Sequence, residues 1–189
     1  MSSRSLGIEG RRHIIAPVAT TLLSREEAVR ILDGGRAEVL VLIDRLPLRA
    51  LSRSGLGGGT WSPKDLLGHL ESWEEHALRA LEAWSHGKPA PIDTALRTEG
   101  LTNVNRAEVA WKAHRSARMA LGRASMTHAR LLTQIAEMSD ARWRAPATRR
   151  GRLPLGHRLG QILAGAREPF RHDEAHLKDL RAFVEDHRA

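Results

Sequence analysis

The 189-residue chain contains no cysteine, which excludes disulfide bonds, thiolate metal ligands and a cysteine nucleophile. Thiol chemistry at this protein would therefore need a thiol supplied by a second molecule. Tyrosine is also absent, and the aromatic residues are two phenylalanines and five tryptophans. Few side chains are thus available to stack on unpaired nucleic-acid bases.

Long apolar runs are missing as well. No segment approaches the roughly 20 apolar residues that span a bilayer, and no apolar run near the N-terminus resembles a secretory signal. Hydrophobic residues make up 41% and charged residues 28% of the chain, the balance of an ordinary globular protein. We therefore expect a cytoplasmic protein without a membrane partner.

Acidic residues are too few to balance the basic ones, because 22 Asp and Glu face 30 Lys and Arg, for a net charge of +8. Part of the excess is local, in Arg142, Arg144, Arg149, Arg150, Arg152 and Arg158. A basic patch can attract nucleic acid or an anionic ligand, whereas the alternative is a solvated loop of an arginine-rich protein. We favour the loop and do not expect nucleic acid to be a partner.

Residues 1–21 show no periodic pattern, and we expect a disordered or peripheral segment there. Within it, residues 8–11 read Ile-Glu-Gly-Arg, a protease-cleavage tetrapeptide common in expression tags. Residues 22–189 are long enough for one domain with a substantial core.

Apolar residues at three- and four-residue spacing predict four helices, over about 24–46, 62–86, 103–138 and 155–186. Ser24 with Glu27 forms a capping box at the first start. We expect Pro169 to kink the last helix, because proline lacks the amide hydrogen and clashes with the preceding turn. No run alternates like a strand. The pattern predicts an all-α four-helix bundle with long connections, including a glycine-rich connector at 48–60.

His172 and His176 are the most informative residues, because an i, i+4 pair on a helix projects two imidazoles from one face. His69 lies on the apolar stripe of the second predicted helix, about a hundred residues upstream. Three such rings would form a metal site with open positions. The competing interpretation is a surface histidine pair and a core histidine bonded to a carbonyl.

Other residues near this pattern are weaker candidates for a role in metal binding or catalysis. His76 and His128 also lie on apolar stripes and could serve as substitute ligands or proton shuttles, although hydrogen-bonded interior residues are the favoured interpretation. Asp173 takes the place of the catalytic Glu in a His-Glu-x-x-His-like run, but its shorter side chain and the all-helical setting argue against a peptidase. Asp173 or Glu174 could orient a ligand or a water; otherwise both are solvated carboxylates.

Two stretches resemble the DinB-like four-helix-bundle family. Residues 61–70, Trp-Ser-Pro-Lys-Asp-Leu-Leu-Gly-His-Leu, followed by Trp73 and Glu74, are similar to the second helix of that family. Residues 171–180, Arg-His-Asp-Glu-Ala-His-Leu-Lys-Asp-Leu, are similar to its last helix with His-x-x-x-His. The similarity covers roughly residues 22–186.

The resemblance implies a homodimeric bundle in which His69, His172 and His176 bind one divalent ion, most often zinc or nickel. It also implies transfer of a low-molecular-weight thiol, such as bacillithiol or mycothiol, to an electrophile or xenobiotic. An open metal site can lower the pKa of a bound thiol or water, so a transferase and a hydrolase both fit. The alternative is a non-catalytic bundle that binds small molecules or responds to stress, with a structural or vestigial metal site.

Overall fold

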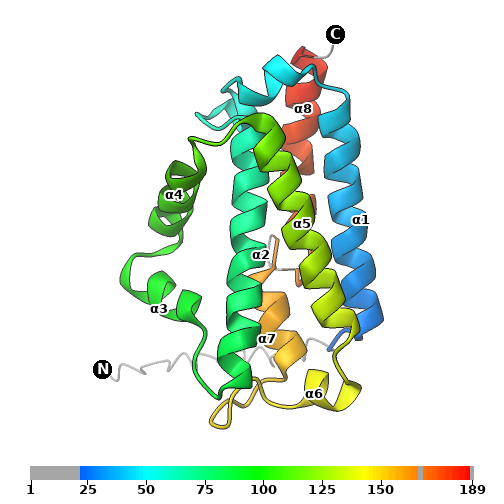
Figure 1. The fold of residues 1–189 in the computed structure, drawn as a ribbon, viewed down its shortest axis with the longest axis vertical. Coiled ribbons are helices and arrows are strands. Elements are labelled where there is room, and N and C mark those ends of the chain that lie inside the picture. Colours follow the sequence, from blue (N-terminus) through cyan, green and yellow to red (C-terminus); the bar gives the residue numbers. More distant parts are fainter. Residues whose placement is uncertain (1–21, 166–167, 188–189) are drawn as a thin grey trace, which may run out of the picture.

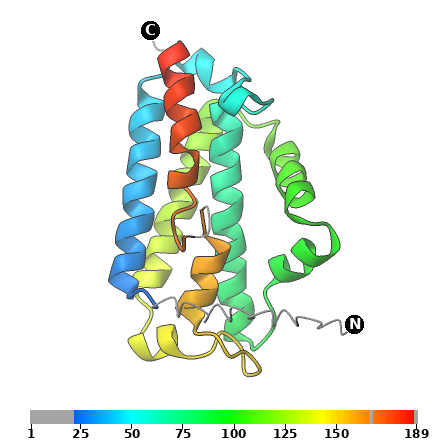
Figure 2. The same ribbon diagram turned by 180° about the vertical axis from the view of Figure 1, so that it is seen from behind.

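The structure is a computed structural model that describes residues 22–165 and 168–187. Figures 1 and 2 show an elongated helical bundle from opposite sides. Within these ranges there are helices and two isolated β-bridges but no strand, which confirms the predicted all-α class. None of the helices described is both long and apolar enough to span a membrane. The prediction for residues 1–21 lies outside the described residues.

Three long helices take three positions of the bundle: α1 (Arg25–Asp44), α2 (Pro63–Ser85) and α5 (Ala117–Ala136). Two shorter helices, α7 (Leu155–Ile162) and α8 (Leu177–His187), share the fourth position. Figure 2 shows them one above the other along the bundle. The predicted four-helix bundle is therefore confirmed, with its last helix divided.

The first two helices begin where the sequence predicts. Ser24 accepts a hydrogen bond from the backbone of Glu27, whose side chain returns one to the Ser24 backbone. Ser62 and Asp65 form the same reciprocal arrangement at the start of α2, with Pro63 at the first helical position. Each capping box satisfies backbone donors that a helix start leaves without partners.

The prediction of one long helix over 103–138 is wrong. The chain instead forms α3 (Pro91–Thr98) in the expected connector and α4 (Leu101–Lys112), and it starts again as α5. Ser116 accepts a hydrogen bond from the backbone of Met119 and caps α5. Because a serine N-cap stabilises a new helix start, the apolar periodicity alone misplaces this boundary.

The α3–α4 unit lies beside α2, outside the four-position bundle (Figure 1). The side chain of Lys64 on α2 donates to the carbonyl of Ala113 at 2.7 Å. The indole of Trp73, also on α2, donates to the side chain of Asn105 on α4 at 3.1 Å. The unit therefore covers one side of α2.

The predicted kinked helix over 155–186 is also wrong. Among the described residues between α7 and α8, which are 163–165 and 168–176, there is one isolated bridge between Gly165 and Glu168 and the single turn η3 (Glu174–His176). The helix already ends at Ile162. Pro169 then keeps the residue just before it from returning to a helix, because proline lacks an amide hydrogen and disfavours helical backbone in the preceding residue. Phe170 follows with a left-handed φ of 64°. Gly160 lets this loop pack on α7, because a β-carbon there would lie 2.9 Å from both Pro169 and Phe170.

The two remaining connections contain short helices. The α1–α2 connection contains η1 (Leu48–Ser52) and η2 (Leu56–Gly58), and α6 (Asp140–Arg144) lies between α5 and α7. Gly55 and Gly57 have φ values of 121° and 62°, which glycine adopts without strain. The glycine run thus builds the tight turns of the connection.

The core consists of two apolar clusters with a polar layer between them. Along α1, Arg36 separates Leu32 of one cluster from Val39 of the other. His128 takes the equivalent place on α5, and Asp173 takes it in the segment before α8. Each of these polar side chains is buried, so the layer crosses the bundle near its middle.

Arg36 is the centre of this layer, with a side chain only 2% exposed. Its Nε lies 2.6 Å from Asp173 Oδ2, and its Nη2 lies 3.1 Å from Glu74 Oε1 on α2. Its Nη1 donates to the carbonyl of Ala124 on α5 at 3.2 Å. His128 Nδ1 lies 2.5 Å from the same Glu74 oxygen. One arginine on α1 therefore connects to all three other positions of the bundle.

Replacing Arg36 with methionine is expected to lower the free energy of unfolding by about 3–5 kcal/mol, because Asp173 and Glu74 would remain buried without their cation. Urea unfolding measures the change. The matched control is Arg181→Met, which removes an exposed pair with Glu38 at 2.6 Å and should cost less than about 1 kcal/mol. Equal losses in the two variants would show that the buried contacts of Arg36 stabilise the fold no more than an exposed ion pair does.

Candidate metal centre

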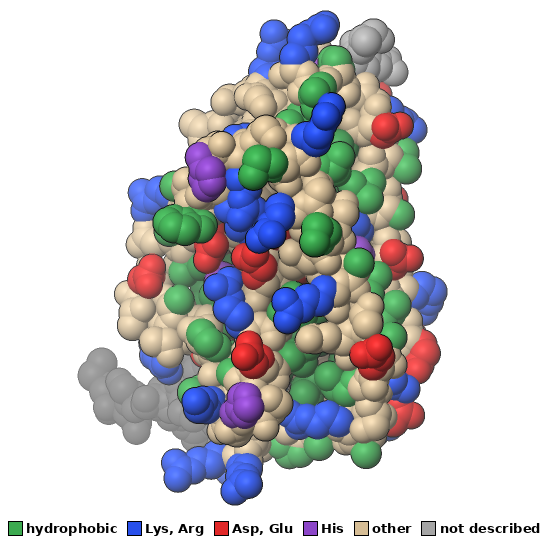
Figure 3. All heavy atoms as spheres, in the orientation of Figure 1, with side chains coloured by type: hydrophobic (Ala, Val, Ile, Leu, Met, Phe, Trp, Pro, Cys, Tyr) green, Lys and Arg blue, Asp and Glu red, His purple; other side chains and the backbone are tan. Residues whose placement is uncertain are grey.

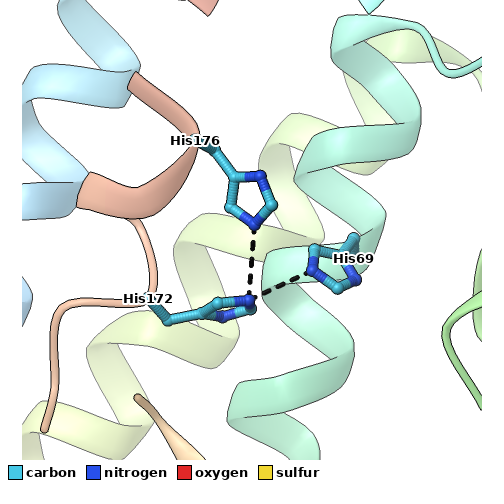
Figure 4. A group of neighbouring side chains, drawn as sticks. All are labelled: His69, His172 and His176. Carbon is cyan, nitrogen blue, oxygen red and sulfur yellow. Dashed lines mark hydrogen bonds between the residues drawn. The ribbon is translucent and has the colours of Figure 1, made fainter. Parts of the chain in front are cut away.

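Three histidine side chains converge beside the polar layer. His69 projects from the middle of α2, and His172 and His176 project from the turn that leads into α8; Figure 4 shows the three rings facing one another. The Nε2 atom of His172 lies 3.1 Å from that of His69 and 3.4 Å from that of His176. One ligand atom from each residue lies within 4.8 Å of the other two.

The His172–His176 pair comes together without an α-helix, which corrects the predicted geometry. The amide of His176 donates to the carbonyl of Asp173 at 3.1 Å, a three-residue spacing typical of a 3-10 turn. The amide of Ala175 donates to the carbonyls of Arg171 and His172, both at 3.2 Å. This compact turn leaves both rings on the same side, as an α-helical turn would have done.

The geometry fits a metal ion coordinated by imidazole nitrogens. Two Zn–N bonds of about 2.0–2.1 Å at a tetrahedral angle place their nitrogens about 3.3 Å apart. The distances from the Nε2 atom of His172 to those of His69 and His176 are close to this value. A neutral imidazole offers one donor and one acceptor, so three converging nitrogens satisfy one another incompletely. The group could therefore hold one metal ion.

The three rings are held in the neutral form that binds metals. Burial lowers the pKa of His69 to about 2, and the neighbouring His172 and His176 lower it further. Burial likewise lowers the pKa of His172 to about 3, with His176 and Arg36 adding to the effect. Burial also lowers the pKa of His176, although Asp173 opposes it. Protons therefore compete little with a cation near neutral pH.

Aromatic packing orients His69. Its Nδ1 is buried and makes no hydrogen bond within the ranges that the structure describes. The ring of Trp61 lies 4.9 Å away and that of Trp73 lies 6.4 Å away, measured between centroids. Metal-binding histidines usually donate their other nitrogen to a carboxylate or carbonyl. Here two indole rings restrict the imidazole instead.

Asp173 supports the site indirectly. Its carboxylate pairs with Arg36 at 2.6 Å, and in the described part of the chain it makes no hydrogen bond to the three rings. Because it lies between His172 and His176 in sequence, this pair fixes the turn that carries both histidines. Glu174 instead accepts two hydrogen bonds of 2.7 Å from Arg171. The role predicted for Asp173 is thus one of anchoring the turn.

His76 and His128 lie apart from the converging rings. His76 Nε2 lies 3.3 Å from Glu108 Oε1, and this imidazole lowers the pKa of Glu108 to about 2. His128 lies next to Glu74 in the polar layer. Both histidines are buried beside carboxylates, in keeping with the favoured interpretation as interior residues.

A cavity of about 440 Å³ opens beside the three rings. Its wall is formed by His69, Trp73, Asp93, Leu96, Leu101, Asn105, Arg158, Gln161, Ile162, Ala164, His172 and His176. The wall thus combines five apolar side chains with the three histidines and with polar groups contributed by α3, α4 and α7. A small molecule in this cavity would contact the converging nitrogens.

The contribution of α3 to this cavity does not follow from the predicted helices, which leave the residues between 86 and 103 as a connection. The available indication was Pro91, which takes the first position of α3, where proline is favoured. Ile92 and Leu96 follow at helical spacing, and Ile92 is buried. A helix of only eight residues gives too short a pattern to distinguish from a loop.

Lowering the pH is expected to destabilise the metal-free protein. His69 and His172 remain neutral in the folded state, whereas the unfolded chain protonates them near pH 6.5. The stability is therefore fully present above about pH 6.5 and falls below it, by at most about 1.4 kcal/mol per pH unit for each histidine. Urea unfolding with a chelator, from about pH 7 down to pH 5, measures this slope.

Two control variants distinguish the contribution of these histidines to the pH dependence of stability from that of other histidines. His172→Ala should reduce the slope by the share of one histidine, whereas replacing the exposed His86 should leave it unchanged. A slope that is the same in the wild-type protein and in His172→Ala would contradict the assignment.

Comparison with known proteins shows which family and which solved structures the chain is similar to. A model of the DinB superfamily matches residues 31–177. An uncharacterised protein from Escherichia coli UTI89 superimposes with a TM-score of 0.71 at 12% identity, over 86% of this chain and 94% of that one. The colibactin self-resistance protein ClbS, solved in complex with double-stranded DNA, gives a TM-score of 0.64 at 14% identity, over 88% and 96% of the two chains. No curated protein matches.

These likenesses bear on two expectations. At such low identity the solved structures show the fold alone, and they agree with the predicted DinB-like bundle. The double-stranded DNA belongs to the complex of that relative, and the expectation that nucleic acid is no partner of this chain stays a prediction. Because the family model covers most of the chain, including the three converging histidines, this protein belongs to the DinB superfamily.

Proposed function

We propose that His69, His172 and His176 bind one divalent metal ion, and that the protein uses it to transfer a low-molecular-weight thiol to an electrophile. The observation that carries this proposal is the convergence of the three imidazoles at the wall of the 440 Å³ cavity. The match to the DinB superfamily supports it. Zinc and nickel are the metals we favour, because both accept imidazole ligands.

When bound, such a metal lowers the pKa of a thiol ligand and so supplies a thiolate at neutral pH. The thiol is a cosubstrate, because the chain has no cysteine. The protein itself holds the three imidazoles neutral and fixes their turn through Asp173. The cavity would hold the thiol and the electrophile beside these three imidazoles.

The cavity lining indicates which electrophiles would bind. Trp73 and Ile162 are buried and present apolar surface, which favours a molecule with an apolar body. Arg158 donates two hydrogen bonds of 2.8 Å to the carboxylate of Asp93 and so closes the wall between α7 and α3. Because each charge compensates the other, the wall presents no strong net charge to the ligand.

Two alternative functions of the same site can be distinguished from thiol transfer by experiment. The same centre could activate water for hydrolysis, since an open metal site lowers the pKa of water as well. A non-catalytic bundle would bind metal and small molecules without turnover. Homodimerisation, expected from the family resemblance, is a separate proposal that sedimentation analysis of the purified protein tests.

Removing one imidazole tests the metal-dependent function. Protein purified without a metal-affinity column should contain about one divalent ion per chain by elemental analysis, and it should consume an electrophile such as a chlorodinitrobenzene only with added thiol. His172→Ala should lose metal and reduce the rate by more than the 10–100-fold that removal of a supporting residue costs. The exposed His114 provides the control substitution.

The alternatives give different results in the same assay. Full activity after chelation would exclude metal dependence. Bound metal and ligand binding without turnover would establish the non-catalytic bundle, and consumption of substrate without thiol would indicate hydrolysis.

A charge placed at the cavity wall tests where the electrophile binds. Leu101 lines the cavity but is 56% exposed, so Leu101→Glu should fold normally. Loss of about 1–2 kcal/mol of apolar contact should raise KM for an apolar electrophile about tenfold and change kcat little. Leu48→Glu, on η1 and 57% exposed, is the matched control and should leave KM unchanged. An unchanged KM in Leu101→Glu would place the electrophile elsewhere.

A further inference from the structure

The positive charge of the protein is concentrated in one segment. Residues 139–165 contain six arginines and one acidic residue, Asp140, so they contribute +5 of the net charge of +8. Asp140 is already paired, because Arg25 on α1 donates to it at 2.8 Å. Arg158 is neutralised by Asp93 on α3, and the other arginines have no carboxylate of their own segment to neutralise them.

Three of these arginines, Arg149, Arg150 and Arg152, lie on an exposed hairpin, so the interpretation as a solvated loop holds for them, with a defined backbone in addition. Residues 145–155, here called the arginine hairpin, run out from α6 and back to α7. Pro146 and Pro154 form an antiparallel bridge, and the amide of Ala147 donates to the carbonyl of Leu153 at 3.2 Å. The backbone is thus a short two-stranded ribbon.

A tight turn forms the tip of this ribbon. The amide of Gly151 donates to the carbonyl of Thr148 at 2.9 Å and closes a four-residue turn. Arg149 and Arg150 take the two central positions, and Arg152 follows directly. Adjacent arginines therefore project from the tip of the ribbon.

The base of the arginine hairpin is fixed to the core. Arg142 donates to the carbonyls of Pro146 and Ala147, at 2.9 and 3.2 Å. Trp143 beneath it is 2% exposed and packs so tightly on Gly156 that a β-carbon there would lie 2.2 Å from the indole. A ligand that binds the tip would therefore meet a ribbon whose shape is set before binding.

The arginines of the tip are available to a partner. Arg149, Arg150 and Arg152 are exposed, as is the neighbouring Arg144 at the end of α6, and none of the four forms an ion pair within the described ranges. The α6–α7 connection lies at the lower end of the bundle in Figure 1, and in Figure 3 basic side chains project from that end. A partner with closely spaced negative charges would complement this surface.

We propose that the arginine hairpin is a docking surface for duplex DNA, an interaction that goes beyond the metal-dependent function and does not require it. The planar fork of arginine suits phosphate oxygens, and a two-stranded ribbon fits the major groove. The turn of residues 148–151 offers no apolar side chain to insert into a bilayer, and Leu153, 41% exposed, is the one large apolar side chain exposed on the hairpin. One leucine is too little apolar surface for membrane insertion, which favours DNA over an anionic membrane. Contacts to phosphates alone make the binding independent of base sequence.

The test removes the two arginines of the turn. Full-length wild-type protein and Arg149→Ala/Arg150→Ala are titrated into a short fluorescein-labelled DNA duplex at several salt concentrations, and anisotropy gives the association constant. Loss of two phosphate contacts should lower the slope of log K against log salt by about 2 and weaken binding to unrelated sequences equally. Metal content and thiol-dependent activity should not change.

A control matched in charge separates docking at the hairpin from general attraction. Arg49→Ala/Arg53→Ala removes the same charge from exposed positions at the opposite end of the bundle and should bind like the wild type. Equal weakening by the two double variants would overturn the proposal, as would a wild-type protein that does not bind the duplex at low salt. Hairpin-dependent binding to phosphatidylserine vesicles without binding to the duplex would also overturn it and assign the surface to membranes.

Discussion

The buried charge of Arg36 is the constraint on which the architecture depends. Desolvating a guanidinium costs several kcal/mol, which opposite charges and hydrogen bonds nearby must offset. The protein supplies that pairing from every other position of the bundle, through Glu74, Ala124 and Asp173. The relative placement of the helices is therefore specified by one directional network, whereas apolar packing on either side of it tolerates small shifts.

This network explains how a candidate metal centre can be built on an interrupted helix. The break between α7 and α8 removes the continuous backbone hydrogen bonds that would otherwise hold His172 and His176. Asp173 lies between them and is anchored by Arg36, so the turn is fixed from the opposite side. His69 approaches from a regular helix and is restricted by aromatic rings. The two halves of the site are thus rigid for different reasons.

Features set by interactions between residues close in sequence can be predicted from the sequence, whereas most features set by distant residues cannot. Capping boxes such as Ser24 with Glu27 are local, and the sequence located those helix starts correctly. The three histidines could be predicted to converge because all lie on apolar stripes. The restart at Ser116 and the interruption near Pro169 were missed, since periodicity continues across both. Arg36 occupies a core position at helical spacing from Leu32, an indication that was available but names no partner.

The two proposed sites share an element although they use different residues. The arginine hairpin continues directly into α7, and that helix contributes Arg158 and Ile162 to the cavity wall. Arg142 and the packing of Trp143 hold the base of the hairpin, so its tip and the cavity wall belong to one continuous supported segment. A polyanion docked at the tip would therefore contact the surface next to the cavity without displacing any of its lining. Substitutions can accordingly remove the chemistry at the histidines without the electrostatic docking, or the docking without the chemistry. Two functions on one small bundle require this independence.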